Sequence, residues 1–268
     1  MSAIAGFLLA SSLQHHIDCG LFAAMLVGTS LVIACGCVIN NIMDRGIDAK
    51  MSRTKQRAMV TGQVTPRTAL VIGLILGIIG FHILLQYVNN LTAFIGFIGL
   101  FFYLILYGYF KRRSTYGTLV GSVSGATPMV AGYTAVTNHF DLAALILFFS
   151  MVFWQMPHFY AIALYRLDDY KRAKLPVMPV SVGVKQTIKV MPLYIIAFTV
   201  TACALTPAGY TRTIYVGLTA ALGIYWLLQS RDGPKTKDTA TWARHMFMWS
   251  LLVLVAWSAA VAAGAVLP

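Results

Sequence analysis

Oxygen-bearing side chains recur at every fourth position in the stretch NNIMDRGID, residues 40–48. On a helix, Asn40, Asp44 and Asp48 share one face and are separated by about 6 Å along the axis. An amide and two carboxylates in a row form an all-oxygen site. Such sites suit Mg²⁺, which keeps several waters and bridges to substrate phosphates. The stretch therefore predicts a metal-assisted site for a phosphorylated substrate.

A plainer alternative is a solvated helix end, whose Asp residues form ion pairs with nearby Arg and Lys residues. The chain contains eight acidic residues, all of them Asp, against 20 Lys and Arg. The NxxxDxxxD spacing in an all-Asp chain favours the metal site over this alternative. Arg53 and Arg57 follow the acidic stretch, and their guanidinium groups can hold phosphate groups directly.

Two further charged stretches are candidates for the same site. Tyr107 and Lys111 are spaced to share a helix face, and Arg112 follows directly. The alternative for these residues is an aromatic anchor at the membrane surface followed by snorkelling cations. In the third stretch, the adjacent Asp168 and Asp169 lie between basic residues. That arrangement indicates either a second metal site or a charge-balanced loop.

The composition indicates that these residues are positioned by segments that span a membrane. Of the 268 residues, 59% are hydrophobic and 10% are charged, whereas soluble domains carry about 25% charged residues. The net charge of +12 does not indicate nucleic-acid binding, because too little polar surface remains to cover a soluble fold. The four cysteines have neither metal nor disulfide spacing, and we expect them to be packing residues.

Eight stretches are long and apolar enough to span a membrane, which requires roughly 20 apolar residues. These stretches are 21–42, 67–88, 91–110, 118–137, 141–164, 187–206, 213–229 and 246–267. A ninth stretch, 1–12, is short, lacks the positive region of a signal peptide, and resembles the second half of a spanning helix. We therefore predict an all-α integral membrane protein in which residues 1–268 form a single domain.

The basic residues lie on one side of this arrangement. Of the 20 Lys and Arg residues, 19 fall in or beside every second loop, and Arg212 is the exception. Because positively charged loops stay in the cytoplasm, we predict that the Asp-rich loops are cytoplasmic and the C-terminus external. The links on the opposite face are short. The chemistry must therefore take place within the membrane or at its cytoplasmic surface.

His158 is an ionisable residue inside an expected span. It lies roughly 15 Å deep by helical rise, near the middle of a hydrocarbon core of roughly 30 Å. An ionisable group in that position is a functional candidate, and imidazole is a common axial ligand of heme iron. The alternative is a histidine that forms a hydrogen bond to a neighbouring helix, at a kink made by Pro157.

Several motifs resemble those of the UbiA superfamily of intramembrane prenyltransferases. NNxxDxxxD followed by MxRTxxR, at residues 40–57, is shared by the whole superfamily. Three further stretches are similar to its heme-directed members: YxxxKRRSxYGTxxGSxSGAxP at 107–128, WQMPH at 154–158, and the run from 166 to 179. The resemblance extends from about residue 3 to residue 260.

This resemblance implies about nine transmembrane helices, the first one short, around a central cavity capped by Asp-rich loops. It implies that the farnesyl group of farnesyl diphosphate is joined to a vinyl group of heme b, with addition of water, giving heme O. Mg²⁺ is the implied cofactor. The implied location is the bacterial inner membrane. The implied partners are the lipid bilayer and a downstream heme-modifying enzyme or terminal oxidase, and nucleic acid is not among them.

The resemblance also implies roles for individual residues. The superfamily has DxxxD in its second acidic loop, but Asp168 and Asp169 are adjacent here, so only Asp169 is carried over. The implied catalytic residues are Asp44, Asp48, Lys111 and Asp169, and the implied metal ligands are Asn40, Asp44, Asp48 and Asp169. The residues implied to bind the substrates are Asn40, Asn41, Arg53, Arg57, Tyr107, Arg112, Trp154, His158 and Lys174.

Two alternative functions are open at this point. The first is a prenyltransferase whose acceptor is a smaller aromatic quinone precursor, and the WQMPH motif argues against it. The second is a transporter, in which polar residues near the midplane would line a path. Transport predicts ionisable residues in several spans, whereas the acids here gather at one end of the spans. The chemistry of the site therefore favours a prenyltransferase.

Overall fold

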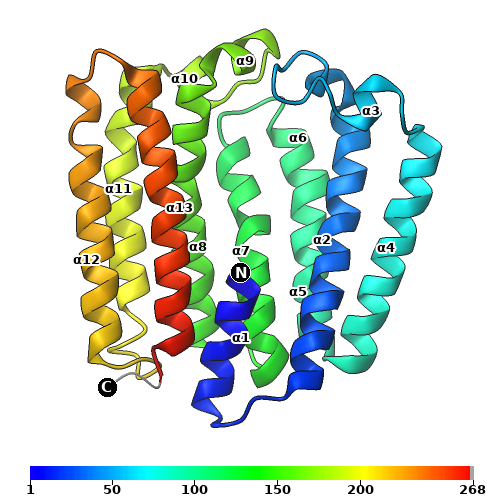
Figure 1. Cartoon of the computed structure of the whole chain (residues 1–268), viewed down its shortest axis with the longest axis vertical. Helices are drawn as coiled ribbons and strands as arrows, with labels where there is room; N and C mark the ends of the chain where they lie inside the picture. The colour runs from blue at the N-terminus through cyan, green and yellow to red at the C-terminus, as the bar shows by residue number, and fades with distance from the viewer. Residues whose placement is uncertain (266–268) are drawn as a thin grey trace.

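The computed structural model describes residues 1–265, and all regular structure in that range is helical, as the sequence predicts. The helices run side by side in one elongated bundle, with the connections at its two ends (Figure 1). They are α1 (Ser2–Leu13), α2 (Cys19–Asp48), α3 (Ala58–Thr61), α4 (Pro66–Tyr87), α5 (Asn90–Phe101), η1 (Phe102–Tyr107), α6 (Gly108–Phe110), α7 (Gly117–Thr137), α8 (Leu142–Tyr165), α9 (Leu167–Arg172), α10 (Met178–Ser181), α11 (Val184–Cys203), α12 (Thr213–Ser230), η2 (Gly233–Lys235) and α13 (Thr239–Ala263).

Seven helical segments within residues 1–265 are long and apolar enough to cross a membrane, by length and composition. They are α2, α4, the continuous α5–η1–α6 segment, α8, α11, α12 with η2, and α13. The expected count of nine is not confirmed, because α1 has only 12 residues and α7 falls short in hydropathy. The predicted span 246–267 reaches beyond the described residues. Its helix, α13, begins earlier, at Thr239, where the Asp238 side chain caps it.

α7 is rich in Gly, Ser and Thr because it packs inside the bundle, against α1, α5 and α8. Its hydroxyl groups bond to its own backbone. Ser122, Ser124 and Thr127 each donate to the carbonyl three residues earlier, at 2.7 to 2.8 Å. At Gly132 an added Cβ would overlap the backbone of Ala3 in α1. Small residues therefore let the two helix backbones approach closely.

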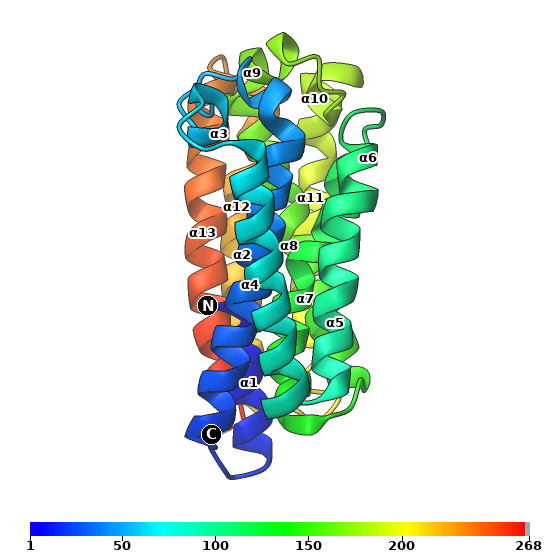
Figure 2. The ribbon, with the colours of Figure 1, turned by 90° about the vertical axis from the view of Figure 1, so that its right-hand side faces the viewer.

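The connections that carry the basic residues lie together at one end of the bundle. α3, α9, α10 and the link between α12 and α13 are at the upper end in Figure 1, and Figure 2 shows α3, α9 and α10 there from the side. The short links after α1, α4, α7 and α11 are at the opposite end. This is the alternation that the distribution of basic residues predicts.

α2 continues past residue 42, the expected end of the first span, to Asp48. The Asp18 side chain caps its other end by accepting a hydrogen bond from the Leu21 amide at 2.9 Å. The added turns carry Asp44 and Asp48, Asn40 lies one turn before Asp44, and all three side chains are buried. One face of this helix end therefore presents all three side chains to the interior, at the end of the bundle where the basic loops meet.

Candidate functional site

A cavity of about 380 Å³, which we call the polar mouth, lies at the loop end of the bundle. Its wall combines residues of α2, α7 and α8 with residues of the first, second and third basic loops. Seven of the residues expected at the site line it, namely Asn40, Asp44, Asp48, Arg53, Arg57, Tyr107 and Lys111. The structure thus brings together charged stretches that are far apart in the sequence.

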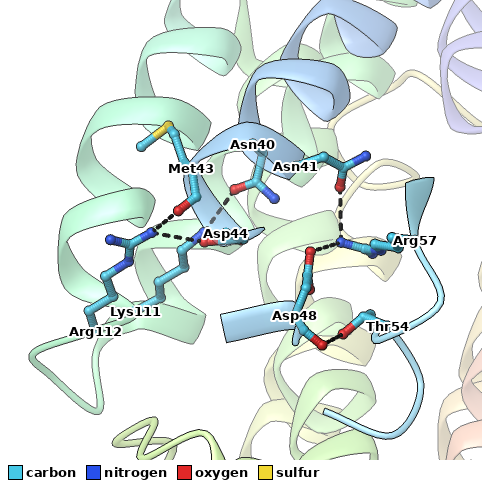
Figure 3. A network of polar contacts seen from close by, with 9 residues as sticks. All are labelled: Asn40, Asn41, Met43, Asp44, Asp48, Thr54, Arg57, Lys111 and Arg112. Carbon is cyan, nitrogen blue, oxygen red and sulfur yellow. Dashed lines mark hydrogen bonds and ion pairs between the residues drawn. The ribbon is translucent and has the colours of Figure 1, made fainter. Parts of the chain in front are cut away.

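Asp44 is held by two cations that follow α6 (Figure 3). Lys111 Nζ donates to Asp44 Oδ2 at 2.6 Å and to Asn40 Oδ1 at 2.8 Å. Arg112 Nη2 donates to Asp44 Oδ1 at 3.1 Å and to the Met43 carbonyl at 2.6 Å. Burial lowers the pKa of the Lys111 ammonium below its usual value, and the contact with Asp44 offsets this only in part.

Asp48, one turn after Asp44 on α2, is paired with Arg57 of the first loop (Figure 3). Arg57 Nη1 donates to Asp48 Oδ2 at 2.8 Å and to Asn41 Oδ1 at 2.9 Å. The Thr54 hydroxyl donates to the backbone carbonyl of Asp48 at 3.1 Å. These contacts fold the first loop back against α2, and they hold Arg57 beside the carboxylate.

Both carboxylates are therefore ion-paired, as in the alternative considered above, but they are buried and not solvated. Residues 1–265 contain no group of three or more His, Cys, Asp or Glu side chains that could hold a metal. The oxygens available to a cation are those of Asn40, Asp44 and Asp48, all hard donors on one helix face. This donor set suits Mg²⁺. A cation must displace basic side chains to reach the two carboxylates.

Aromatic rings form part of the same wall. The helix widens into a six-residue π-helix over Phe102–Tyr107, a rare turn that frequently occurs at functional sites. The rings of Tyr103 and Tyr107 stack with their centroids 5.9 Å apart and 8° between their planes, and Lys111 Nζ lies 4.9 Å from the Tyr107 centroid. Our sequence analysis missed Tyr103, although it precedes Tyr107 by the same four residues that separate Tyr107 from Lys111.

A second cavity of about 210 Å³, the apolar chamber, adjoins the polar mouth, and Tyr103, Ser124 and Gly125 line both. Its other lining residues come from α2, α4, α5 and α7 and are Thr29, Val32, Ile33, Gly36, Cys37, Leu84, Gly96, Gly99, Leu100, Thr127, Pro128 and Ala131. Of its four glycines, only Gly96 has room for a side chain, because an added Cβ at Gly36, Gly99 or Gly125 would crowd a neighbouring side chain. The site is therefore a charged mouth that adjoins a largely apolar chamber.

The WQMPH motif presents other residues to the mouth than those expected. Gln155 lines it together with Phe159, which directly follows the motif, whereas Trp154 and His158 face α13, where Trp154 Nε1 donates to the Ser250 carbonyl at 2.9 Å. His158 Nδ1 lies 2.7 Å from the Ser250 hydroxyl, and its ring stacks on Trp154 at 4.8 Å. Neighbouring helix positions point about 100° apart, so one motif serves two different surfaces.

Asp169 contacts the first loop and does not line the mouth. The Ser52 amide and hydroxyl donate to its two oxygens at 3.2 and 2.7 Å, and Arg172 donates as well. Burial raises the pKa of the Asp169 carboxyl, but these hydrogen bonds and the Arg172 charge outweigh it, so the pKa lies below its usual value. Asp168 and Lys174, in the same loop, are exposed and do not line the mouth.

Comparisons with known proteins point to one family of prenyltransferases. The model of the UbiA prenyltransferase family matches residues 1–252. Protoheme IX farnesyltransferase 2 of Pseudomonas fluorescens is 46% identical over 259 residues, which cover 96% of this chain and 87% of that protein. Protoheme IX farnesyltransferase of Pseudomonas savastanoi pv. phaseolicola is 47% identical with the same coverage.

A solved structure also has this fold. A UbiA homologue from Archaeoglobus fulgidus, bound to GPP and Mg²⁺, superposes with a TM-score of 0.64 at 15% identity, covering 97% of this chain and 96% of that one. At this identity the likeness establishes the fold alone. The family match and the two relatives extend over most of the chain, and with its apolar helices they make it an integral membrane protein. The chain belongs to the UbiA prenyltransferase family.

Proposed function

We propose that this chain transfers the farnesyl group of farnesyl diphosphate to a vinyl group of heme b, with addition of water, giving heme O and diphosphate. The observation that carries the proposal is the charged mouth beside an apolar chamber, because a prenyl diphosphate likewise has a charged part and an apolar part. The names of the relatives, protoheme IX farnesyltransferase, support heme b as the acceptor. They do not favour a quinone precursor.

Cations at the mouth would bind the diphosphate. Arg53, Arg57 and Lys111 line it, and phosphate oxygens can replace the carboxylates as partners of Arg57 and Lys111. The oxygens of Asp44 and Asp48, with Asn40, would then be free to hold Mg²⁺. When bound, the metal supplies positive charge against the negative charge that develops on the leaving diphosphate. Arg112, already bonded to Asp44, would add a further positive charge at the same place.

In the proposed reaction, the bond between the first farnesyl carbon and the diphosphate oxygen breaks, and its electron pair leaves with the diphosphate. The vinyl π electrons attack the allylic cation and form the new carbon–carbon bond. Water then adds to the cation left on the former vinyl group and loses a proton, which leaves a hydroxyl group. The stacked rings of Tyr103 and Tyr107 are placed to stabilise the allylic cation by cation–π contact.

Heme binding is proposed for the other face of the WQMPH motif. His158 is an ionisable residue buried in a spanning helix, which favours a functional role. Its Nδ1 is engaged with Ser250, so Nε2 is the nitrogen left for iron, and Trp154 would pack beside the porphyrin. The substrate-binding roles of Asn41 and Lys174 are also proposals. The contact of Asn41 with Arg57 supports a role in orienting that cation.

The orientation of the chain is part of the proposal. Because 19 of the 20 basic residues lie in or beside alternate loops, the loop end with its Asp residues would face the cytoplasm, across the bacterial inner membrane. The mouth would then open toward the water-soluble head of farnesyl diphosphate. The heme product would pass to a downstream heme-modifying enzyme or terminal oxidase.

The test uses membranes that contain this chain, supplied with heme b, farnesyl diphosphate and Mg²⁺, with mass spectrometry of the extracted hemes. We expect a product heavier by a farnesyl and a hydroxyl group, which disappears when a chelator is added. Asp44→Ala and Asp48→Ala should each abolish it. Asp232→Ala, at an exposed Asp on the loop end, should leave it unchanged. A chain that prenylates a quinone precursor and leaves heme b untouched would refute the proposal.

A further inference from the structure

The first and third loops are joined by one buried carboxylate. Asp169, in α9, accepts from both the backbone amide and the hydroxyl of Ser52, at 3.2 and 2.7 Å, across 117 positions of sequence. Arg172, one turn later, donates to the same carboxylate. Asp169 is only 4% exposed, and both of its oxygens are engaged by side chains and backbone of the chain itself.

The neighbours of these two residues, and not the two residues themselves, reach the polar mouth. Arg53 follows Ser52, and Tyr170 follows Asp169, and both line the mouth. Met51, which precedes Ser52, also lines it and is buried. The Ser52–Asp169 contact therefore fixes the backbone on two sides of the mouth at the points from which Arg53 and Tyr170 project.

We infer that Asp169 is a positioning residue: its carboxylate latches the first loop to α9 through Ser52, and so holds Arg53 and Tyr170 at the rim of the mouth. The inference rests on the proposed function for the identity of the diphosphate that Arg53 meets. It differs from the role that the family resemblance implies, in which Asp169 is a metal ligand. The two roles predict different behaviour for Ser52, which has no part in a metal site.

The first test needs no substrate. The first loop carries several trypsin sites, at Lys50, Arg53, Lys55 and Arg57, and the contact between Ser52 and Asp169 holds the backbone of this loop in one conformation. In the detergent-solubilised full-length protein, Ser52→Ala and Asp169→Asn should each speed cleavage of this loop about tenfold, as expected for loss of a hydrogen bond to a charged group. Asp168→Asn changes the exposed neighbouring Asp and should leave the rate unchanged. Ser52→Thr keeps the hydroxyl group and should also leave it unchanged.

The double variant Ser52→Ala, Asp169→Asn should be cleaved no faster than the faster single variant, because both changes break the same hydrogen bond, from the Ser52 hydroxyl to the Asp169 carboxylate.

The second test is kinetic. Both single variants should raise KM for farnesyl diphosphate about tenfold while the Mg²⁺ concentration for half-maximal rate stays the same. The inference is overturned if Asp169→Asn shifts the Mg²⁺ requirement while Ser52→Ala behaves as wild type, or if neither variant opens the loop to trypsin. Since cleavage is read without heme or farnesyl diphosphate, failure of the latch is distinct from failure of the proposed function.

Discussion

Lys111 is the most deeply buried cation of the polar mouth. Its side chain is 9% exposed, whereas those of Arg57 and Arg112 are 34% and 43% exposed. Removing an ammonium group from water is costly unless an anion compensates, so Lys111 must always have a partner. In the structure that partner is Asp44, and in the proposed reaction it is the diphosphate.

Lys111→Met should therefore lower kcat for heme O formation by about 100-fold, as expected when a preorganised charge that stabilises the leaving group is lost. The matched control is Arg113→Met. Arg113 lies two positions along the chain, and its guanidinium packs 4.1 Å above the Tyr109 ring, away from the carboxylates. Equal activity of the two variants would remove Lys111 from the mechanism.

His158 offers a spectroscopic prediction at the same scale. If Nε2 ligates heme iron, His158→Ala should shift the Soret band of heme bound to the purified protein. Ser250→Ala removes the 2.7 Å contact to Nδ1 and the bond that the hydroxyl donates to the Phe247 carbonyl, keeps the imidazole ring, and should shift the band less. An identical Soret band in wild type and His158→Ala would assign this histidine to helix packing against α13.

At the scale of elements, helical periodicity carried most of what could be predicted. The i, i+4, i+8 spacing placed Asn40, Asp44 and Asp48 on one helix face, and all three line the mouth. The same rule pairs Gln155 with Phe159, four residues later and just after WQMPH, and both line the mouth, whereas the chemical reactivity of His158 points to the other helix face. The contact between Ser52 and Asp169 had no such signal, because spacing within a helix says nothing about which loops meet.

The apolar chamber between α2, α4, α5 and α7 leads to a prediction on chain length. A Cβ at Gly96 would lie 3.5 Å from Leu84 and 3.8 Å from Phe81, which are ordinary contacts, so the backbone tolerates a side chain there. Gly96→Leu should fill part of the chamber and lower kcat/KM for farnesyl diphosphate about tenfold. The shorter geranyl diphosphate should be affected much less.

Gly217→Leu is the control for this variant, because an added Cβ at Gly217 meets nothing within 4 Å and the residue lies on α12, away from the chamber. Its kcat/KM should match wild type for both diphosphates. Equal losses for the two diphosphates in Gly96→Leu would mean that the farnesyl chain lies elsewhere.

At the scale of the whole molecule, the basic loops lie at one end of the bundle and the last helix finishes at the other, which leads to a prediction of membrane topology. The loop end carries most of the basic residues, and α13 runs from it to the opposite end, finishing at Ala263 (Figure 1). A reporter fused after residue 268 should therefore read as external, and one inserted at Lys237, between α12 and α13, as cytoplasmic. A cytoplasmic signal from the C-terminal fusion would reverse or break the proposed orientation.

The ion pairs at the polar mouth also determine the order in which its ligands arrive. Three cations (Arg57, Lys111 and Arg112) pair with the two carboxylates of Asp44 and Asp48, and a fourth, Arg53, also lines the mouth. The side chains of the site thus carry an excess of positive charge, which repels a bare divalent cation and attracts a polyanion. In the proposed reaction, association would then be ordered: the diphosphate would bind first, or arrive already carrying its metal. Free Mg²⁺ alone should leave the thermal unfolding of the protein unchanged.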